Sequence, residues 1–216
     1  MRASNAVLDP QAIARKPTQQ RSKDRFDQVL QEAEKLLNDE GLSGFSIPVL
    51  AERLGYTRGS VYAWFPTTYA ILNELALRYL GELERLFLTR ADQLAKLDWR
   101  ESIETVVDLA VSFHNSHPAA RLLILGGAVT DDSYRAQELT IKRLGELGRA
   151  IWMSKGLVLP TEPDVATVAT DIGTACFRRS FFEHGTITPA YRDTAAAAMT
   201  RFLEPYVREA AVKTRR

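Results

Sequence analysis

The stretch from Leu50 to Thr67, LAERLGYTRGSVYAWFPT, restricts the fold of this chain more than any other segment. A short apolar run ends at Gly55, and Thr57 opens a second short run that ends at Pro66. Glycine readily ends a helix, threonine can cap the next one, and proline breaks it. Because helices this short cannot enclose a core alone, the pattern predicts a tightly turned helix pair packed on further helices.

The spacing of apolar residues predicts helices along the rest of the chain as well. Phe26 to Leu37 form one apolar helical face that ends at Gly41, and Ser46 can cap the helix that carries Leu50. Further helices are expected at 67–96, 101–116, 118–125 and 132–155, and from about 165 and about 190. Since no stretch alternates with a period of two, we predict an all-α fold with about nine helices.

Composition and charge narrow the functional classes. The formal net charge is only +1, so a nucleic-acid site must arise from local clustering of basic residues. Residues 1–25 hold six basic and two acidic side chains with little apolar periodicity, which predicts a flexible basic arm, placed at 1–17. A single cysteine excludes an intramolecular disulfide. No signal peptide or membrane span is recognised, so we expect a cytoplasmic protein with no membrane partner.

The second short helix has the composition of a DNA-reading element. Its inward residue is Val61, and its outward residues are Arg58, Gly59, Ser60, Tyr62, Ala63 and Trp64. Small residues near a helix start let it enter the major groove, where an arginine can donate in a fork to guanine. Tyr62 and Trp64 have polar tips that can reach phosphates, and the helix starts at Ser46, Thr57 and Thr67 also suit phosphate. The same spacing also occurs in helical bundles that do not bind DNA.

The segment GFSIPVLAERLGYTRGSVYAWFPTTYAIL resembles the DNA-binding signature of the TetR family of bacterial transcriptional repressors. The matching features are Ala51 in mid-helix, Gly55, the Thr57 cap, the Val61–Tyr62 pair and Phe65–Pro66. The resemblance covers about residues 21–75. Beyond that region, only the order of helices is similar to the family.

The resemblance implies a homodimer that binds a palindromic operator in double-stranded DNA, with reading heads about 34–36 Å apart. It implies a helix-turn-helix DNA-binding domain at 18–66 and a helical domain for effector binding and dimerisation at 67–216. The DNA contacts that it implies are Ser46, Thr57, Arg58, Gly59, Ser60, Tyr62, Trp64, Thr67 and Thr68. Thr68 replaces a basic residue that is common in the family, and Pro48 replaces a polar one. Phosphate attraction would then depend more on Arg21, Lys23 and Arg25.

The last two helices carry apolar residues on more than one face, which favours a four-helix contact between two copies. The residues expected in this contact are Phe181, Ala195, Ala198, Met199 and Phe202. The alternative is that both helices belong to the core of a monomer. A small, mostly apolar effector is expected among aromatic and polarizable residues of the middle and late helices, namely Trp99, Phe113, His114, Tyr134, Trp152, Cys176 and Phe177.

Other functions are weakly supported by the sequence. His114 and His117 have a spacing that can face a metal, but no acidic residue lies nearby in the sequence to complete a site, so no metal or cofactor is expected. No nucleophile with a base and no carboxylate pair stands out by its spacing, so we do not expect an enzyme. An all-helical adaptor that binds only protein, or an enzyme that uses a cavity in the second domain, remain the alternatives.

Overall fold

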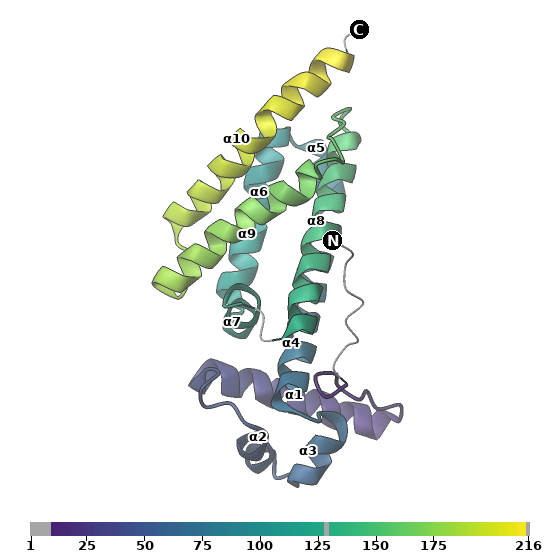
Figure 1. Ribbon diagram of the computed structural model, residues 1–216, viewed down its shortest axis with the longest axis vertical. Coiled ribbons are helices and arrows are strands. Elements are labelled where there is room, and N and C mark those ends of the chain that lie inside the picture. The colour runs from purple at the N-terminus through teal and green to yellow at the C-terminus, as the bar shows by residue number, and fades with distance from the viewer. Residues whose placement is uncertain (1–9, 128–129, 215–216) are drawn as a thin grey trace. The chain divides into compact units, whose positions relative to one another are not determined.

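The computed structural model describes residues 10–127 and 130–214. Within these residues the regular elements are helices, and the only β-type pairing is an isolated bridge between Thr161 and Asp164. The all-α prediction is therefore confirmed (Figure 1). The helices are α1 (Gln20–Glu40), α2 (Ile47–Leu54), α3 (Arg58–Trp64), α4 (Thr68–Leu88), α5 (Ala91–Lys96), α6 (Trp99–Ser116), α7 (Pro118–Leu125), α8 (Asp131–Met153), α9 (Val165–His184) and α10 (Pro189–Thr214).

The chain divides into two compact units. The first extends to Tyr79 and also takes in residues 127–136, and the second contains residues 80–126 and those from 137 onward. The core of the first unit forms where α1, α3 and the start of α4 meet. Phe26 stacks on Phe65 with ring centroids 4.6 Å apart, and Ile71 is fully buried. Burial of these large apolar side chains is the main force that holds these helices together.

The N-terminal segment differs from the sequence expectation. Residues 1–9 of the predicted arm lie outside the described residues, whereas part of the remainder packs against the first unit. Ala12 is buried, and the Arg15 amide donates to the Trp64 carbonyl at 2.7 Å. Helix α1 begins at Gln20 rather than near Phe26, because its polar first turns tolerate full exposure to solvent.

The second unit is built around α6, α9 and α10, with α9 and α10 packed along each other (Figure 1). A Cβ at Gly145 of α8 would lie 2.7 Å from the Thr167 Cα, so α8 approaches α9 closely there. The single helix predicted for 67–96 is wrong, because α4 ends at Leu88 and α5 starts at Ala91. At the break, the Thr89 hydroxyl donates to the Leu86 carbonyl, a local bond that competes with continued helix.

Candidate functional site

Helix α2 and the turn after it are fixed by local hydrogen bonds. The Ser46 hydroxyl accepts from the Val49 amide at 3.4 Å, which caps the helix start, and Pro48 lies in the first turn. Gly55 ends the helix in the left-handed region with a φ of 65°, where a side chain would be strained. The Tyr56 amide then donates to the Ala51 carbonyl at 2.9 Å. These bonds produce the tight turn that the sequence predicts.

Helix α3 presents a small, polar surface next to its cap. Thr57 accepts from the Ser60 amide at 3.2 Å, and the two hydroxyl oxygens lie 2.7 Å apart. Val61 is fully buried, as expected for the inward residue, whereas Arg58, Gly59 and Ser60 are exposed. Arg58 forms no ion pair within the described part of the chain, so its guanidinium is available to a partner.

The remaining predicted contacts of this unit differ in exposure. Tyr62 is 43% exposed and lines an open groove of about 650 Å³ together with Thr67 and Thr68. The Thr67 hydroxyl already donates to the Gln11 carbonyl at 2.6 Å and caps α4 through the Ala70 amide at 3.3 Å.

Trp64 is half-buried with its ring edge-on to Phe26, at a centroid distance of 6.4 Å. Its indole therefore takes part in the packing of the first unit, a role that the sequence analysis did not assign to it. Of the predicted residues on α3, those from Arg58 to Tyr62 other than Val61 are the most accessible.

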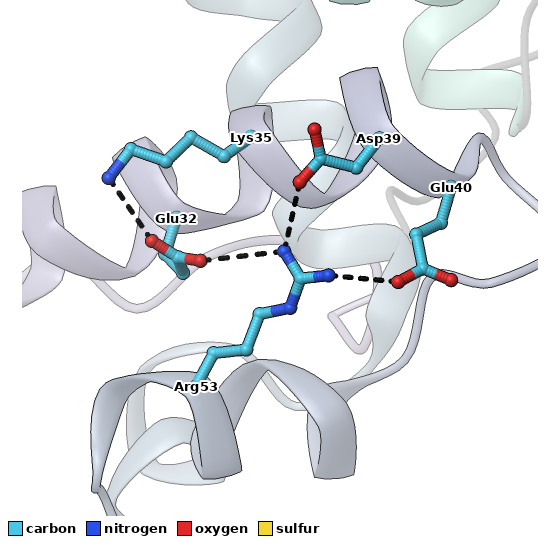
Figure 2. Close-up of polar contacts among 5 residues, drawn as sticks. All are labelled: Glu32, Lys35, Asp39, Glu40 and Arg53. Atoms are coloured by element: carbon cyan, nitrogen blue, oxygen red, sulfur yellow. Dashed lines mark hydrogen bonds and ion pairs between the residues drawn. The ribbon is translucent and has the colours of Figure 1, made fainter.

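Arg53 of α2 is held by three carboxylates of α1 (Figure 2). Its guanidinium nitrogens lie 3.7 Å from Glu32, 3.2 Å from Asp39 and 2.8 Å from Glu40. The hydrogen bond to Asp39, followed by the negative charges of Glu40 and Asp39, raises the pKa of Arg53 despite some desolvation. Sequence reasoning missed this cluster because the partners lie 13 and 14 positions away on another helix. The cluster links α2 to α1, and two of the five N–H donors of the Arg53 guanidinium are used in hydrogen bonds to Asp39 and Glu40.

A second contact that the sequence did not reveal is centred on Asn73 of α4, whose side chain is buried. Its amide nitrogen donates to the Ala12 carbonyl at 3.0 Å, and its amide oxygen accepts from the Thr130 hydroxyl at 3.1 Å. We call these three residues the Asn73 clasp. The neighbouring Glu74 carboxylate is also buried and pairs with Lys16 at 3.0 Å. The clasp joins three segments that are distant in sequence within the first unit.

The second unit encloses a cavity of about 90 Å³. It is lined by residues of α4, α5, α6, α8, α9 and α10, namely Leu83, Phe87, Leu94, Val106, Val107, Ala110, His114, Leu144, Leu147, Gly148, Ile151, Thr170, Gly173, Thr174, Phe177 and Met199. Burial, followed by electrostatic repulsion from Arg121 and His117, lowers the pKa of His114 to about 4. The imidazole is therefore neutral near pH 7.

The structure brings two of the seven predicted pocket residues, His114 and Phe177, to this cavity. Trp152 lines a smaller adjacent cavity of about 50 Å³. Phe113 stacks on His117 with centroids 4.7 Å apart, and Trp99 lies under the Arg100 guanidinium at 4.3 Å.

Tyr134 and Cys176 also lie away from the cavity walls. Tyr134 is exposed and belongs to the first unit, and Cys176 is half-buried, with burial raising the pKa of its thiol. Aromatic residues occur at buried, half-buried and exposed positions of the bundle, so their presence in the sequence could not separate cavity walls from other packing.

Two of the residues predicted at a dimer interface are corrected by the structure. Ala195 is fully buried and Met199 nearly so, because this face of α10 packs on α9 and α6 within the same chain. Phe181, Ala198 and Phe202 are half-buried. The exposed apolar positions lie elsewhere, with Phe182 of α9 81% exposed.

No group of three or more His, Cys, Asp or Glu side chains suited to a metal occurs among residues 10–127 and 130–214. None of the helices described here is long and apolar enough to cross a membrane.

Comparison with known proteins connects the first unit to a defined family. Residues 29–75 match the sequence pattern of the bacterial regulatory proteins of the TetR family. The HTH-type transcriptional regulator EthR of Mycobacterium tuberculosis is 30% identical over 96 residues, which are 44% of this chain and 44% of EthR. The alignment thus spans less than half the length of this relative, and the same holds for EthR of Mycobacterium bovis.

Solved structures extend the likeness to the whole fold. A TetR-family transcriptional regulator from Streptomyces coelicolor superposes with a TM-score of 0.65 at 20% identity, covering 85% of this chain and 98% of that one. The TetR-family regulator PfmR from Thermus thermophilus gives a TM-score of 0.53 at 18% identity, covering 82% and 98%. The N-terminal region of the chain thus matches the TetR family of bacterial regulatory proteins, and most of the chain shares its fold with solved TetR-family regulators.

Proposed function

We propose that this chain is a sequence-specific transcriptional repressor that binds a near-palindromic DNA operator as a homodimer. We further propose that a small, mostly apolar effector bound in the second unit changes its affinity for the operator. The exposed face of α3 carries the proposal: Arg58 supplies a forked cation beside two small residues, Gly59 and Ser60. An arginine in this setting can form two hydrogen bonds with guanine in the major groove.

Gly59 supports this role because the fold has no need of it. A Cβ at Gly59 would meet nothing within 4 Å, and the residue has no positive φ. Glycine inside a helix costs about 0.5–1 kcal/mol relative to alanine. A bare backbone at this point favours a close approach of α3 to base edges, which accounts for a residue that otherwise only weakens the helix.

Phosphate contacts are assigned to the first turns of α1, where Arg21, Lys23 and Arg25 are exposed. These residues precede the buried Phe26 on α1, the helix that also carries the carboxylate partners of Arg53. Because the Arg53 guanidinium already pairs with carboxylates of α1, we do not assign it to this role. Neutralised phosphates release counterions, so affinity should fall as salt rises, with a slope set by the number of contacts.

The dimer contact is assigned to the exposed faces of α9 and α10. On α9, Val168, Ala175 and Phe182 are exposed and recur every seven residues, which places them in one stripe. On α10, Ala190 and Ala197 are exposed at the same spacing. Small residues beside a large aromatic allow two copies of this helix pair to approach closely in a two-fold contact.

Selection of bound fragments from genomic DNA tests the proposal with the full chain. A palindrome should be recovered, and Arg58→Ala should weaken its binding by about 1–3 kcal/mol and relax preference at one base position. Arg85→Ala, an exposed arginine at the end of α4, is the matched control and should change neither. Binding that is independent of salt, or an Arg58→Ala variant that retains the full sequence preference, would contradict the proposal.

A further inference from the structure

The cavity of the second unit contains a single polar group left without a hydrogen-bond partner. Thirteen of its lining residues are apolar or glycine, and the other three are His114, Thr170 and Thr174. The Thr170 hydroxyl donates to the Ala166 carbonyl at 3.2 Å, and that of Thr174 donates to the Thr170 carbonyl at 3.0 Å. Both threonine protons are therefore used within α9, which leaves the imidazole as the polar feature of the wall.

His114 is 3% exposed, and its Nδ1 has no hydrogen-bond partner in the structure. A buried polar atom without a partner costs about 1–3 kcal/mol, a penalty that a hydrogen-bonding ligand removes. Aromatic rings of Phe113 and Phe177 flank the imidazole at centroid distances of 5.5 and 6.4 Å. They hold the ring in an apolar setting in which a hydrogen bond is strengthened.

We propose that this cavity binds a neutral, slender, mostly apolar molecule whose single hydrogen-bonding group pairs with the His114 imidazole. The assignment of this cavity as the effector site rests on the function proposed above. Its preference among ligands, however, can be measured without DNA. A hydroxyl or carbonyl group suits a neutral imidazole, which offers one donor and one acceptor.

The dimensions of the cavity indicate a narrow ligand that can extend along the bundle. The main cavity holds about 90 Å³ and the adjacent one about 50 Å³. Met199 lines both cavities, and its Sδ would lie 2.8 Å from a Cβ at Gly173. Methionine is flexible and changes rotamer at low cost, so a longer ligand can displace this side chain and join the two spaces.

Charge argues against an ionised ligand. The residues that line the main cavity carry no Asp, Glu, Lys or Arg side chain, so an ion entering it would lose its hydration without a countercharge. Arg121 lies behind His114, and its Nη1 donates to the carbonyls of His114 at 3.1 Å and Asn115 at 3.4 Å. Arg121 is the nearby group that would favour an anion. The experiment therefore includes an anionic probe.

The test uses the full chain without DNA and four probes of equal ring size: benzene, phenol, benzoate and benzylammonium. Calorimetry or ligand-observed NMR gives each dissociation constant for the parent, His114→Phe and Thr174→Val. Phenol should bind the parent roughly 3- to 10-fold more tightly than benzene, as one neutral hydrogen bond allows. His114→Phe should abolish that ratio, whereas Thr174→Val, the matched control in the same wall, should preserve it. Benzoate and benzylammonium should bind at least about 10-fold more weakly than phenol.

An equal phenol-to-benzene ratio in the parent and His114→Phe would overturn the assignment of His114. Tightest binding of benzoate would instead indicate an anion site at Arg121 and would overturn the neutral-ligand class. Failure of every probe to bind a folded parent protein at millimolar concentration would also overturn it. Phenol that binds as expected but leaves operator affinity unchanged would contradict the effector part of the proposed function and leave the ligand preference intact.

Discussion

The two units of the chain differ in whether a buried polar side chain has hydrogen-bond partners. In the first, both ends of the Asn73 amide have partners, at 3.0 Å from the Ala12 carbonyl and 3.1 Å from the Thr130 hydroxyl. In the second, the buried His114 has a ring nitrogen with no partner. A buried amide with all its hydrogen bonds fixes the segments that it joins. A buried nitrogen without a hydrogen-bond partner lowers the stability of the folded chain.

This difference separates a structural polar group from one that is open to a ligand. Removal of the Asn73 side chain should lower the free energy of unfolding, because its partners would lose their hydrogen bonds. Removal of the His114 nitrogens should be nearly neutral at pH 7, because a ring of similar size would keep the packing. The following predictions test whether that contrast holds, in order of decreasing expected effect.

Asn73→Ala should lower the free energy of unfolding by about 2–4 kcal/mol, since the buried Ala12 carbonyl loses its donor and a small cavity forms. Urea denaturation at pH 7 measures the loss. His114→Phe, measured in parallel, should stay within about 1 kcal/mol of the parent. If the two variants lost equal stability, the distinction between the two buried groups would be unfounded.

Acidification should destabilise the protein through His114. The pKa of His114 is about 4 in the folded chain, against the ordinary value of 6.5. As the pH falls through this window the unfolded chain takes up a proton that the folded chain does not, so stability present above pH 6.5 is lost toward pH 4. Between pH 7 and pH 5 the loss should be about 2 kcal/mol.

The neighbours that face His114 also carry charge, so the variant comparison isolates its contribution. Arg121 and His117 both disfavour protonation of the His114 imidazole. His114→Phe should remove the acid-dependent loss assigned to this ring while leaving the other titrations in place. A variant with the same decline between pH 7 and pH 5 as the parent would place the acid sensitivity in other groups.

Thr130→Val should cost about 1 kcal/mol, because it leaves the Asn73 amide oxygen buried without its hydroxyl donor. The matched control is Thr130→Ser, which keeps the hydroxyl and should restore most of the stability. Thermal unfolding monitored by circular dichroism distinguishes the two. Equal losses in both variants would mean that the methyl contact, not the hydrogen bond, matters here.

Local patterns were sufficient to predict most of the helices and the turn at Gly55. The cap at Thr57, the left-handed glycine and the inward Val61 all depend on neighbours within four residues, which is the range of a helical turn. The break between α4 and α5 was not predicted because the residues on both sides of Thr89 form helix. Capping and periodicity rules, which use neighbours within one helical turn, do not predict such a break.

The contacts that define the sites are of longer range and were not predicted. Arg53 meets α1 partners 13 and 14 residues away, and Asn73 meets partners 57 and 61 residues away. A single sequence has no periodicity at such separations. The buried face of α10 was mistaken for an interface for the same reason, because the sequence shows which residues are apolar but not which helix covers them.

Gly59 is an exception to the contrast between the two units, because it is a destabilising residue in the first unit. Because a Cβ there would meet nothing within 4 Å, Gly59→Ala should raise the free energy of unfolding by about 0.5–1 kcal/mol. The same change should weaken operator binding if α3 lies against base edges, and mobility-shift titration alongside urea denaturation measures both quantities. Gly81→Ala in α4, where a Cβ also meets nothing within 4 Å, should add similar stability without affecting DNA binding. If the Gly59→Ala variant were more stable and bound the operator as tightly as the parent, glycine at this position would have no role in DNA recognition.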